Sequence, residues 1–297
     1  MPHNAVSRLE LLGAAFLFST GGAAIKATTL TGWQVACFRS AVAGIVLFLL
    51  LPSARRNWSW RAPLVGLAYA ATLISFVVAN KLTTAANTIF LQSTAPLYLL
   101  LLGPWLLRER IRRPDVVVMA VIAVGFSFFF LGRQESFATA PDPFRGNAIA
   151  AASGVFWALT IAGLRWAQSL GQGKECGLAT VVAGNLIAAL VSLPMALPVA
   201  QSEVTDWVAI GYLGVFQIGL AYVLLTRGVR HVPALATSLL MLAEPAMNPV
   251  WAWLAHGERP GPLALAGGAL ILAGAIGRTL RSASDSEPGS VASRLDG

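Results

Sequence analysis

Glu244 is an acidic residue in the middle of an apolar run that extends from about residue 233 to residue 255. A charged side chain costs roughly 2.5–3.5 kcal/mol at the centre of a membrane helix, so an acid at this depth is a functional candidate by default. Its carboxylate can take up a proton or bind the ammonium group of a substrate. Alternatively, a protonated Glu244 could hydrogen-bond to a neighbouring helix and hold the helices together. The sequence leaves both interpretations open.

Polar residues share the helical face of Glu244. At helical spacing, Thr237 and Asn248 lie on this face, and a related stretch 149 residues earlier carries Gln92 on the corresponding face. Two such faces can meet at a cavity near the membrane midplane. Aromatic and amide residues in the middle of other apolar runs are expected to complete its lining. The candidate substrate-binding residues are Tyr69, Phe76, Asn80, Gln92, Tyr98, Trp157, Gln217, Tyr222, Glu244 and Asn248.

Pro96 and Pro245 occupy corresponding positions in the two related stretches. Proline removes a backbone hydrogen bond and bends a helix. Inside a membrane the freed carbonyl must find a partner or line a wet cavity. The sequence therefore predicts a kink at the same depth in both helices. A kink that only serves packing is the alternative.

Three basic residues, Lys26, Arg39 and Lys81, lie near the ends of apolar runs. Long basic side chains can extend to the membrane surface while their stems stay in the apolar layer. We therefore expect all three to reach the outer surface and to have structural roles. This expectation leaves Glu244 as the single charged group of the predicted cavity.

No enzyme signature accompanies these residues. The zinc-binding HExxH, the nucleophile elbow GxSxG and a phosphate-binding glycine loop are all missing from the sequence. Cys37 and Cys176 fit no metal-ligand spacing, and they are predicted near opposite membrane faces, too far apart for a disulfide. We expect no catalytic residue, no metal and no cofactor.

The elements that position these residues are apolar runs. The chain is 56% hydrophobic and only 11% charged, against roughly 25% charged residues in soluble domains. Runs of 18 or more apolar residues indicate transmembrane helices. The sequence predicts an all-α polytopic membrane protein with ten spans, at about 9–29, 33–52, 62–81, 83–107, 114–132, 147–167, 176–199, 206–226, 233–255 and 260–278.

The positive charge follows the loops. With both termini in the cytoplasm, the inner segments hold 15 of the 21 basic residues and the outer segments hold five. This bias predicts cytoplasmic termini. It also accounts for the net charge of +8 without a nucleic-acid partner, which leaves a small-molecule substrate and the lipid bilayer as expected partners.

The two halves repeat without a gap at the 149-residue offset. Five helices is an odd number, so the second half must be inverted relative to the first, as in many transporters. The predicted organisation is a first repeat at 9–132, an external linker at 133–146, an inverted second repeat at 147–278 and a disordered cytoplasmic tail at 279–297. Small residues in the fifth and tenth helices suggest close packing, within a monomer or at a homodimer contact.

The pattern Thr88-x-x-Leu91-x-x-x-x-Pro96 followed by Glu109-Arg110, with its second copy Thr237-x-x-Leu240-x-x-x-Glu244-Pro245 followed by Glu258-Arg259, resembles the EamA domain of the drug/metabolite transporter superfamily. The resemblance covers residues 9 to 278. It implies a bacterial inner-membrane protein and a secondary transporter similar to exporters of amino acids, among them aromatic amino acids. Ala95 stands where the second copy has Glu244, so an acid-dependent role would fall to one half.

Other functions remain as alternatives. A multidrug or sugar-conjugate carrier of the same superfamily is the nearest. A nucleotide-sugar carrier ranks low, because it would need several buried basic groups for the phosphates. A membrane scaffold that transports nothing and a passive channel are the alternatives from other classes.

Overall fold

The computed structural model describes residues 2–56, 58–106, 113–131, 138–169, 176–229, 231–232 and 234–284. All regular elements in these residues are helices, as the apolar runs predict. The elements are α1 (Pro2–Ser19), α2 (Gly21–Lys26), α3 (Gly32–Leu50), α4 (Pro52–Arg56), α5 (Arg61–Leu82), α6 (Ala85–Gln92), α7 (Ala95–Leu106), α8 (Arg113–Leu131), α9 (Pro143–Ser169), α10 (Cys176–Ala196), α11 (Val204–Tyr212), the π-helix η1 (Leu213–Leu220), α12 (Ala221–Gly228), α13 (Ala234–Met241), α14 (Ala243–His256) and α15 (Pro262–Ser284).

Eight segments of the described chain are long and apolar enough to cross a membrane. The predicted span 260–278 corresponds to α15, whose apolar part, Pro262–Gly277, is shorter. The predicted span 233–255 corresponds to α13 and α14, which are short pieces of eight and 14 residues. The structure therefore gives a multi-pass helical membrane protein, and the ten-span count stays a prediction. The eight segments are Ala5–Lys26, Gly32–Leu50, Arg61–Leu82, Ala85–Leu102, Arg113–Leu131, Pro143–Trp166, Gly177–Ala196 and Val204–Gly228.

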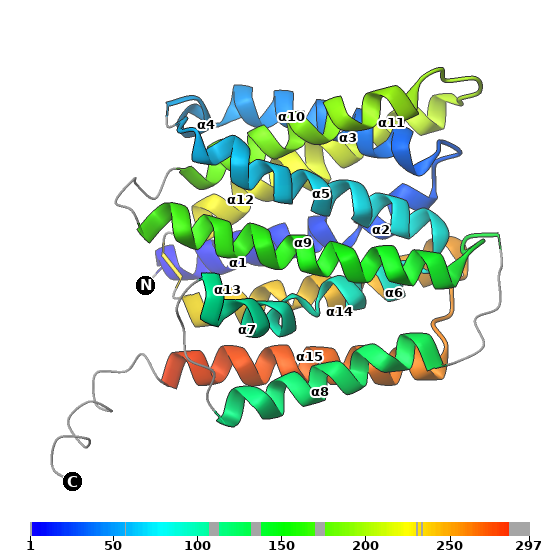
Figure 1. The fold of residues 1–297 in the computed structure, drawn as a ribbon. Helices are drawn as coiled ribbons and strands as arrows, with labels where there is room; N and C mark the ends of the chain where they lie inside the picture. Colours follow the sequence, from blue (N-terminus) through cyan, green and yellow to red (C-terminus); the bar gives the residue numbers. More distant parts are fainter. Residues whose placement is uncertain are drawn as a thin grey trace, which may run out of the picture.

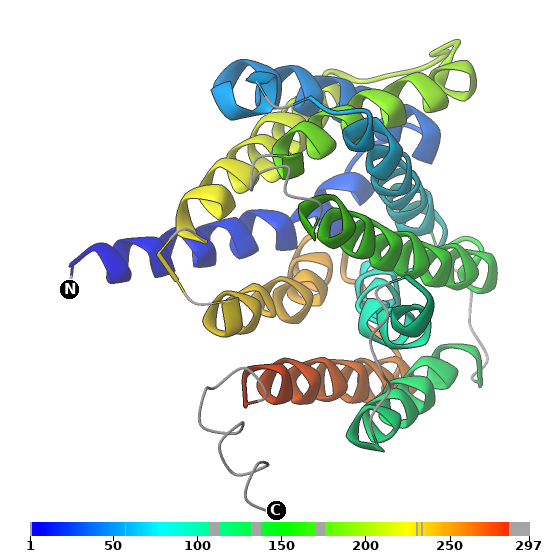
Figure 2. The same cartoon turned by 60° about the vertical axis from the view of Figure 1, so that its left-hand side comes forward.

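The helices lie side by side along one direction, and α1 begins at the same end of the bundle at which α15 ends (Figure 1). We call this the N-terminal end and the opposite one the distal end. In both ribbon views, α3 and α10 lie on one side of the bundle and α8 and α15 on the other (Figure 2). The halves of the chain interleave, because α3 packs against α10, α5 against α9 and α8 against α15.

Glycines bring α8 and α15 together. A Cβ added at Gly125 would lie 2.7 Å from the carbonyl oxygen of Gly267, and a Cβ added at Gly267 would lie 2.6 Å from that of Gly125. Small residues allow this close backbone approach in membrane helices. The predicted close packing of these two helices is thus an intramolecular contact at the glycines.

Four of the predicted spans are interrupted. The first splits into α1 and α2 at Thr20, the fourth into α6 and α7 after Gln92, and the ninth into α13 and α14 at Leu242. The eighth contains η1, in which each backbone bond spans one residue more than in an α-helix. π-Helical segments are frequent at functional sites.

Hydroxyl groups account for two of the breaks better than proline does. Ser93 Oγ donates to the Ile89 carbonyl at 2.7 Å, and Thr94 Oγ1 donates to the Leu91 carbonyl at 2.6 Å. Thr20 Oγ1 donates to the Leu17 carbonyl at 2.7 Å in the same way. Such bonds give the backbone an alternative to the helix pattern. Pro96 then lies in the first turn of α7, where its missing N–H is tolerated.

The outer boundaries of the repeats are only partly described. α9 begins at Pro143, before residue 147 where the second repeat was predicted to start, and residues 132–137 of the predicted linker lie outside the described residues. α15 continues to Ser284, past residue 278. The remaining part of the predicted tail, residues 285–297, lies outside the described residues.

Candidate functional site: a cavity at the helix breaks

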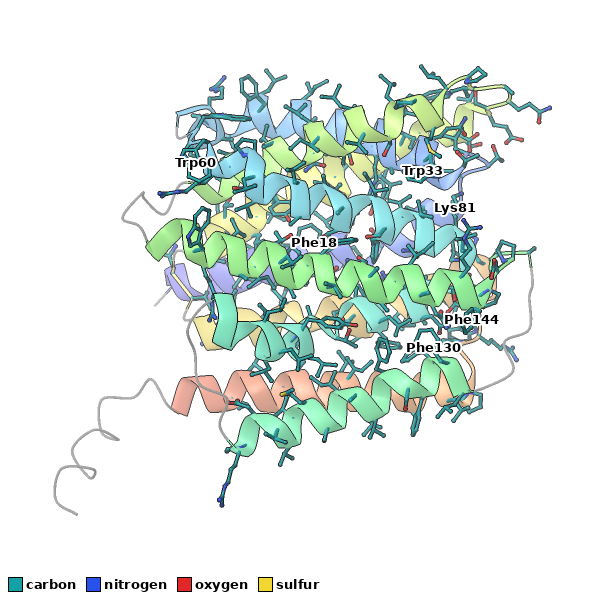
Figure 3. The ribbon with its side chains drawn as sticks, viewed as in Figure 1. Phe18, Trp33, Trp60, Lys81, Phe130 and Phe144 are labelled. Carbon is teal, nitrogen blue, oxygen red and sulfur yellow. The ribbon has the colours of Figure 1, made fainter. Side chains whose placement is uncertain are left out.

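A cavity of about 220 Å³ lies among the interrupted helices. Phe18, one of its lining residues, lies near the middle of the bundle, whereas Trp60 lies at the N-terminal end and Lys81 at the distal end (Figure 3). The lining comes from seven of the predicted spans. It consists of Phe18, Arg39, Tyr69, Thr72, Leu73, Phe76, Ile89, Gln92, Ser93, Trp157, Gln217, Ile218, Tyr222, Leu225, Met241, Glu244 and Pro245.

Residues at the helix breaks form part of the cavity wall. Phe18 is at the end of α1, Gln92 ends α6, and Met241 ends α13. Gln217 belongs to η1, and its Nε2 donates to the Phe18 carbonyl at 3.3 Å. Carbonyl groups at a helix break in a membrane need such partners.

Most of the sequence-predicted site residues lie on this cavity, and three do not. Among the ten, the structure brings together Tyr69, Phe76, Gln92, Trp157, Gln217, Tyr222 and Glu244. Of the two predicted kink prolines, Pro245 lines the cavity and Pro96 does not.

Asn80, Tyr98 and Asn248 point elsewhere. Asn80 is fully buried, and its Nδ2 donates to the Phe76 carbonyl at 3.0 Å within α5. Asn248 is fully buried against α2, where a Cβ added at Gly22 would lie 2.7 Å from Asn248 Oδ1. Tyr98 packs against α9. The direction of each side chain depends on how its helix is rotated about its own axis. The sequence pattern did not determine this rotation precisely enough to separate cavity residues from their neighbours.

Glu244 lies in the first turn of α14 and is half-buried. Within the part of the chain that the structure describes, its carboxylate makes no hydrogen bond and no ion pair. The positive end of a helix dipole favours a carboxylate at this position. The hydrogen bond to a neighbouring helix, which the structural interpretation of Glu244 requires, is thus missing among the described residues.

Arg39 is the charged cavity residue that the sequence-based prediction missed. The prediction that it reaches the outer surface is wrong, because Arg39 is only 2% exposed and lines the cavity. Its Nη2 donates to the Leu73 carbonyl at 3.3 Å, and its Nε has no partner among the residues that the structure describes. α3 packs against α5, α10 and η1, which cover the side chain. The signal was that Arg39 lies farther from the end of its predicted span than Lys26 or Lys81 does.

Aromatic rings form much of the wall. Tyr69 and Tyr222 share a hydrogen bond of 2.8 Å between their hydroxyl groups. Phe18 meets Tyr222 edge to face at a centroid distance of 5.3 Å, and Trp157 lies 6.3 Å from Tyr69. Such rings offer apolar surface and can also attract a cation through their faces.

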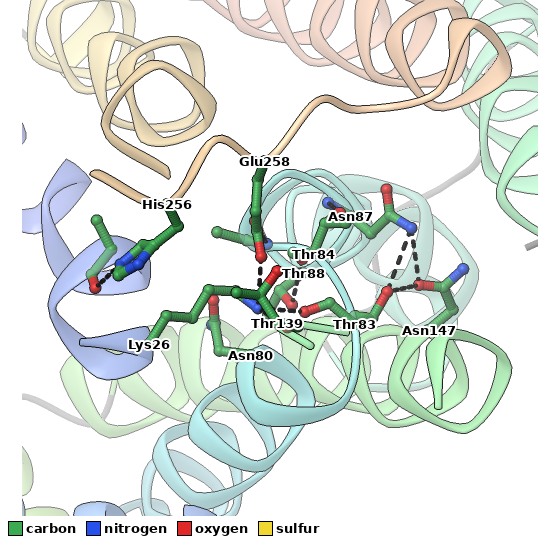
Figure 4. A network of polar contacts seen from close by, with 12 residues as sticks. Lys26, Asn80, Thr83, Thr84, Asn87, Thr88, Thr139, Asn147, His256 and Glu258 are labelled. Atoms are coloured by element: carbon green, nitrogen blue, oxygen red, sulfur yellow. Dashed lines mark hydrogen bonds and ion pairs between the residues drawn. The ribbon is translucent and has the colours of Figure 1, made fainter. Parts of the chain in front are cut away.

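A second group of buried charges lies at the distal end (Figure 4). Lys26 Nζ lies 2.8 Å from Glu258 Oε1, and both side chains are 2% exposed. Lys26 also donates to the carbonyls of Thr83 and Thr139, and Glu258 Oε2 accepts the Ala85 N–H at 3.0 Å. We call Lys26, Thr83, Ala85, Thr139 and Glu258 the distal cluster. The prediction that Lys26 reaches the outer surface is therefore wrong.

Lys81 also bonds within the protein. It lies at the distal end and is half-buried, and its Nζ donates to the carbonyl and the hydroxyl of Thr28 at 2.6 and 2.9 Å. Both distal lysines thus satisfy carbonyl groups at loop and helix ends. This use of a buried lysine was not visible in the sequence, because the partners are far apart along the chain.

The site can bind charge but contains no set of groups for covalent chemistry. Among the described residues, no three His, Cys, Asp or Glu side chains come together as metal ligands. Cys37 is a free buried thiol whose Sγ lies 3.3 Å from the Ala189 carbonyl, and the side chain of Cys176 lies outside the described residues. A cavity with one acid, one base and aromatic walls suits a small charged organic molecule.

Known proteins resemble the chain along most of its length. The model of the EamA-like transporter family matches residues 9–131 and 144–279. The chain is 25% identical to a pseudopaline exporter of Pseudomonas aeruginosa (strain UCBPP-PA14) over 271 residues, which cover 89% of this chain and 92% of that protein. It is 30% identical to a threonine/homoserine exporter of Escherichia coli (strain K12) over 172 residues, 57% of this chain and 56% of that protein. A crystal structure matches the fold with a TM-score of 0.60 at 21% identity, over 95% of this chain and 99% of the other.

Proposed function

Because the chain belongs to the EamA-like transporter family, we propose that it is a secondary transporter that exports amino acids and related small metabolites across the bacterial cytoplasmic membrane. The family and the exporter relatives make it a multi-pass membrane transporter of a small molecule, and not an enzyme. The amino-acid specificity and the direction of transport are our proposal.

The observation that carries the proposal is the unpartnered Glu244 carboxylate in an aromatic-walled cavity in the middle of the bundle. A carboxylate and aromatic faces are suited to a substrate ammonium group. The cavity, at about 220 Å³, is smaller than the roughly 300–1,000 Å³ of pockets for drug-sized ligands, which favours amino acids over a multidrug substrate. The exporter of threonine and homoserine among the relatives supports the same class. The number of aromatic rings favours aromatic amino acids within it.

We propose alternating access between inverted repeats as the mechanism. α6 ends at Gln92 and α13 at Met241, which correspond under the 149-residue offset. The pairs α3–α10 and α8–α15 each join one helix to its counterpart in the other half, as a two-fold relation between the halves requires. Substrate sites between such repeats are typically formed by broken helices, and rocking of one repeat against the other opens them alternately.

The proposed orientation places the N-terminal end in the cytoplasm. It rests on the excess of arginine in the loops at this end and on the shared end at which α1 begins and α15 ends. In this orientation the distal cluster lies on the outer side of the cavity.

The oligomeric state is open between a monomer and a homodimer. Gly125 of α8 and Gly267, Gly268 and Gly274 of α15 pack within the bundle. Exposed alanines lie on both helices as well: Ala120, Ala123, Ala266, Ala269 and Ala273. A molar mass measured by light scattering in detergent distinguishes the two states.

Counterflow in proteoliposomes tests the proposed function. Vesicles preloaded with threonine, homoserine, phenylalanine or tryptophan should accumulate the same labelled amino acid transiently, and a lipophilic cation should not exchange. Val124→Ala, a change on an exposed face of α8, serves as the matched control and should exchange like the wild type. Exchange of the lipophilic cation alone would favour the multidrug alternative. Flux without saturation would indicate a channel, and no movement of any solute would indicate a scaffold.

A further inference from the structure

The cavity is lined by two groups of opposite charge, the buried Arg39 and the half-buried Glu244, which do not pair with each other. Arg39 makes a single hydrogen bond, to the Leu73 carbonyl, and forms no ion pair with any carboxylate in the described part of the chain. Glu244 forms no ion pair there either, although both residues line the same cavity. Charges buried without a partner are costly, and the cost is lifted when an opposite charge binds. Direct pairing of Arg39 with Glu244 would have lifted it without a ligand.

From this arrangement we propose that the cavity binds the zwitterionic head group of an α-amino acid, with the substrate carboxylate on Arg39 and the substrate ammonium on Glu244. The inference rests on the proposed function and narrows it, because it defines the substrate by two charged groups on one carbon. It also assigns Arg39 a binding role in place of the structural role expected from the sequence.

Arg39 is chemically suited to the substrate carboxylate, and Glu244 is chemically suited to the substrate ammonium. The guanidinium group offers a planar fork of N–H donors that binds a carboxylate with two parallel hydrogen bonds, and the buried Arg39 Nε has no partner among the described residues. An ammonium group can donate to Glu244 and to neutral acceptors, and the buried Gln217 Oε1 has no partner within the described part of the chain.

A single ligand can pair with both ionised residues only if it carries both charges. A simple amine would compensate Glu244 and leave the buried charge of Arg39 unpaired. A simple carboxylic acid would compensate Arg39 and leave Glu244 without a cation. A lipophilic cation, like the amine, would leave Arg39 unpaired. Arg39 and Glu244 together therefore also select against multidrug substrates.

The rest of the wall is suited to the substrate side chain. Phe18, Phe76 and Trp157 are apolar or amphipathic and present no further charge. Fixed recognition of the head group together with an apolar wall allows several amino-acid side chains to bind. The breadth of specificity therefore comes from the aromatic wall and the amino-acid class from the two charges.

Competition with threonine counterflow tests the inference on the wild-type protein, without relying on any variant to fold. The competitors are 1-aminopropan-2-ol, which lacks the carboxylate, and 3-hydroxybutanoate, which lacks the amine. Loss of a hydrogen-bonded charged partner predicts that each competes roughly 10- to 100-fold less well than unlabelled threonine. If either analogue competes as well as threonine, the inference is overturned while the proposed function stands. If threonine and the other amino acids do not exchange at all, the proposed function fails and the inference fails with it.

Two neutral variants give a reciprocal test. Arg39→Gln should lose affinity for threonine but keep its affinity for the amine, and Glu244→Gln should lose affinity for threonine but keep its affinity for the acid. A general defect in folding would lower all affinities together and would not produce this crossed pattern. Arg39→Lys keeps the charge and loses the planar fork, so it should retain more threonine exchange than Arg39→Gln. Equal threonine exchange by Arg39→Gln and the wild type would overturn the assignment of Arg39.

Discussion

Lys26 and Glu258 meet at 2.8 Å with both side chains 2% exposed, whereas Arg39 and Glu244 line one cavity and form no ion pair. Both regions hold one base and one acid inside the bundle. In the distal cluster the charges compensate each other and also bind backbone groups of helix and loop ends. In the cavity, Arg39 and Glu244 have no ion-pair partner among the described residues, and we propose that a ligand supplies both partners. Burial alone therefore does not distinguish a charged residue with a structural role from one that could bind a ligand. The presence or absence of an ion-pair partner within the protein is the more useful criterion.

The comparison predicts that stability depends on the distal cluster and transport on the cavity. The largest loss of stability is expected for Lys26→Met. Glu244→Gln should change stability least, although it affects transport most directly. Unfolding of the purified protein in detergent is the common measurement.

Lys26→Met should have the largest effect. It leaves Glu258 buried without its cation, and removal of one partner from a buried pair costs roughly 3–5 kcal/mol. The expected result is a strongly lowered unfolding temperature. The double variant with Glu258→Gln should recover part of the loss, because no unpaired charge remains. If Lys26→Met were as stable as the wild type, the prediction that stability depends on the distal cluster would be wrong.

Asp206→Asn should have the next largest effect. Asp206 is fully buried at the distal end, where its two carboxylate oxygens accept the N–H and the hydroxyl of Thr29, both at 2.7 Å. The asparagine places an NH₂ donor opposite one of these donors, which should cost roughly 1–3 kcal/mol. Thr29→Val removes only the hydroxyl and serves as the milder control. An Asp206→Asn variant no less stable than Thr29→Val would contradict the prediction.

Tyr69→Phe removes a neutral contact within the cavity. The hydroxyl bond to Tyr222 should contribute roughly 0.5–1.5 kcal/mol. Tyr222→Phe should cost a similar amount, and the double variant should cost less than the sum, because both changes remove one bond. Additive losses would show that the two hydroxyl groups act independently.

Glu244→Gln should leave stability within about 0.5 kcal/mol of the wild type, as expected where no contact is lost. Counterflow of amino acids should fall to background or lose its dependence on pH. The glutamine keeps the shape of the side chain and removes only its charge and titration. Wild-type transport by this variant would assign Glu244 to helix packing. A marked loss of stability would likewise favour the structural interpretation.

The sequence predicted the all-helical class of fold, because long apolar runs depend only on local composition. It did not predict the location of Arg39. Depth along α3 suggested an outward side chain, but the direction depends on α5, α10 and η1, which come from other parts of the chain. The Lys26–Glu258 pair was hidden for the same reason, since the two residues are 232 positions apart.

The candidate site could also be predicted only in part from the sequence. The cavity residues of α5, such as Tyr69 and Phe76, could be recognised as polar or aromatic residues in the middle of a span. Asn80 was selected by the same rule, yet its amide bonds within α5, one turn beyond Phe76. The helix breaks were expected at the prolines but lie nearer to Ser93, Thr94 and Leu242. Local hydroxyl bonds and helix rotation are set by tertiary packing, which a single sequence does not report.

The reciprocal contact of Gly125 and Gly267 has a consequence for the order of synthesis. α8 leaves the ribosome when half of the chain has still to be made, and its partner α15 is the last helix to follow. Chains fold from the N-terminus as they are produced. During translation the glycine groove of α8 therefore faces lipid or the insertion machinery until the final helix arrives. A chain that ends before α15 therefore leaves Gly125 on α8 without this partner.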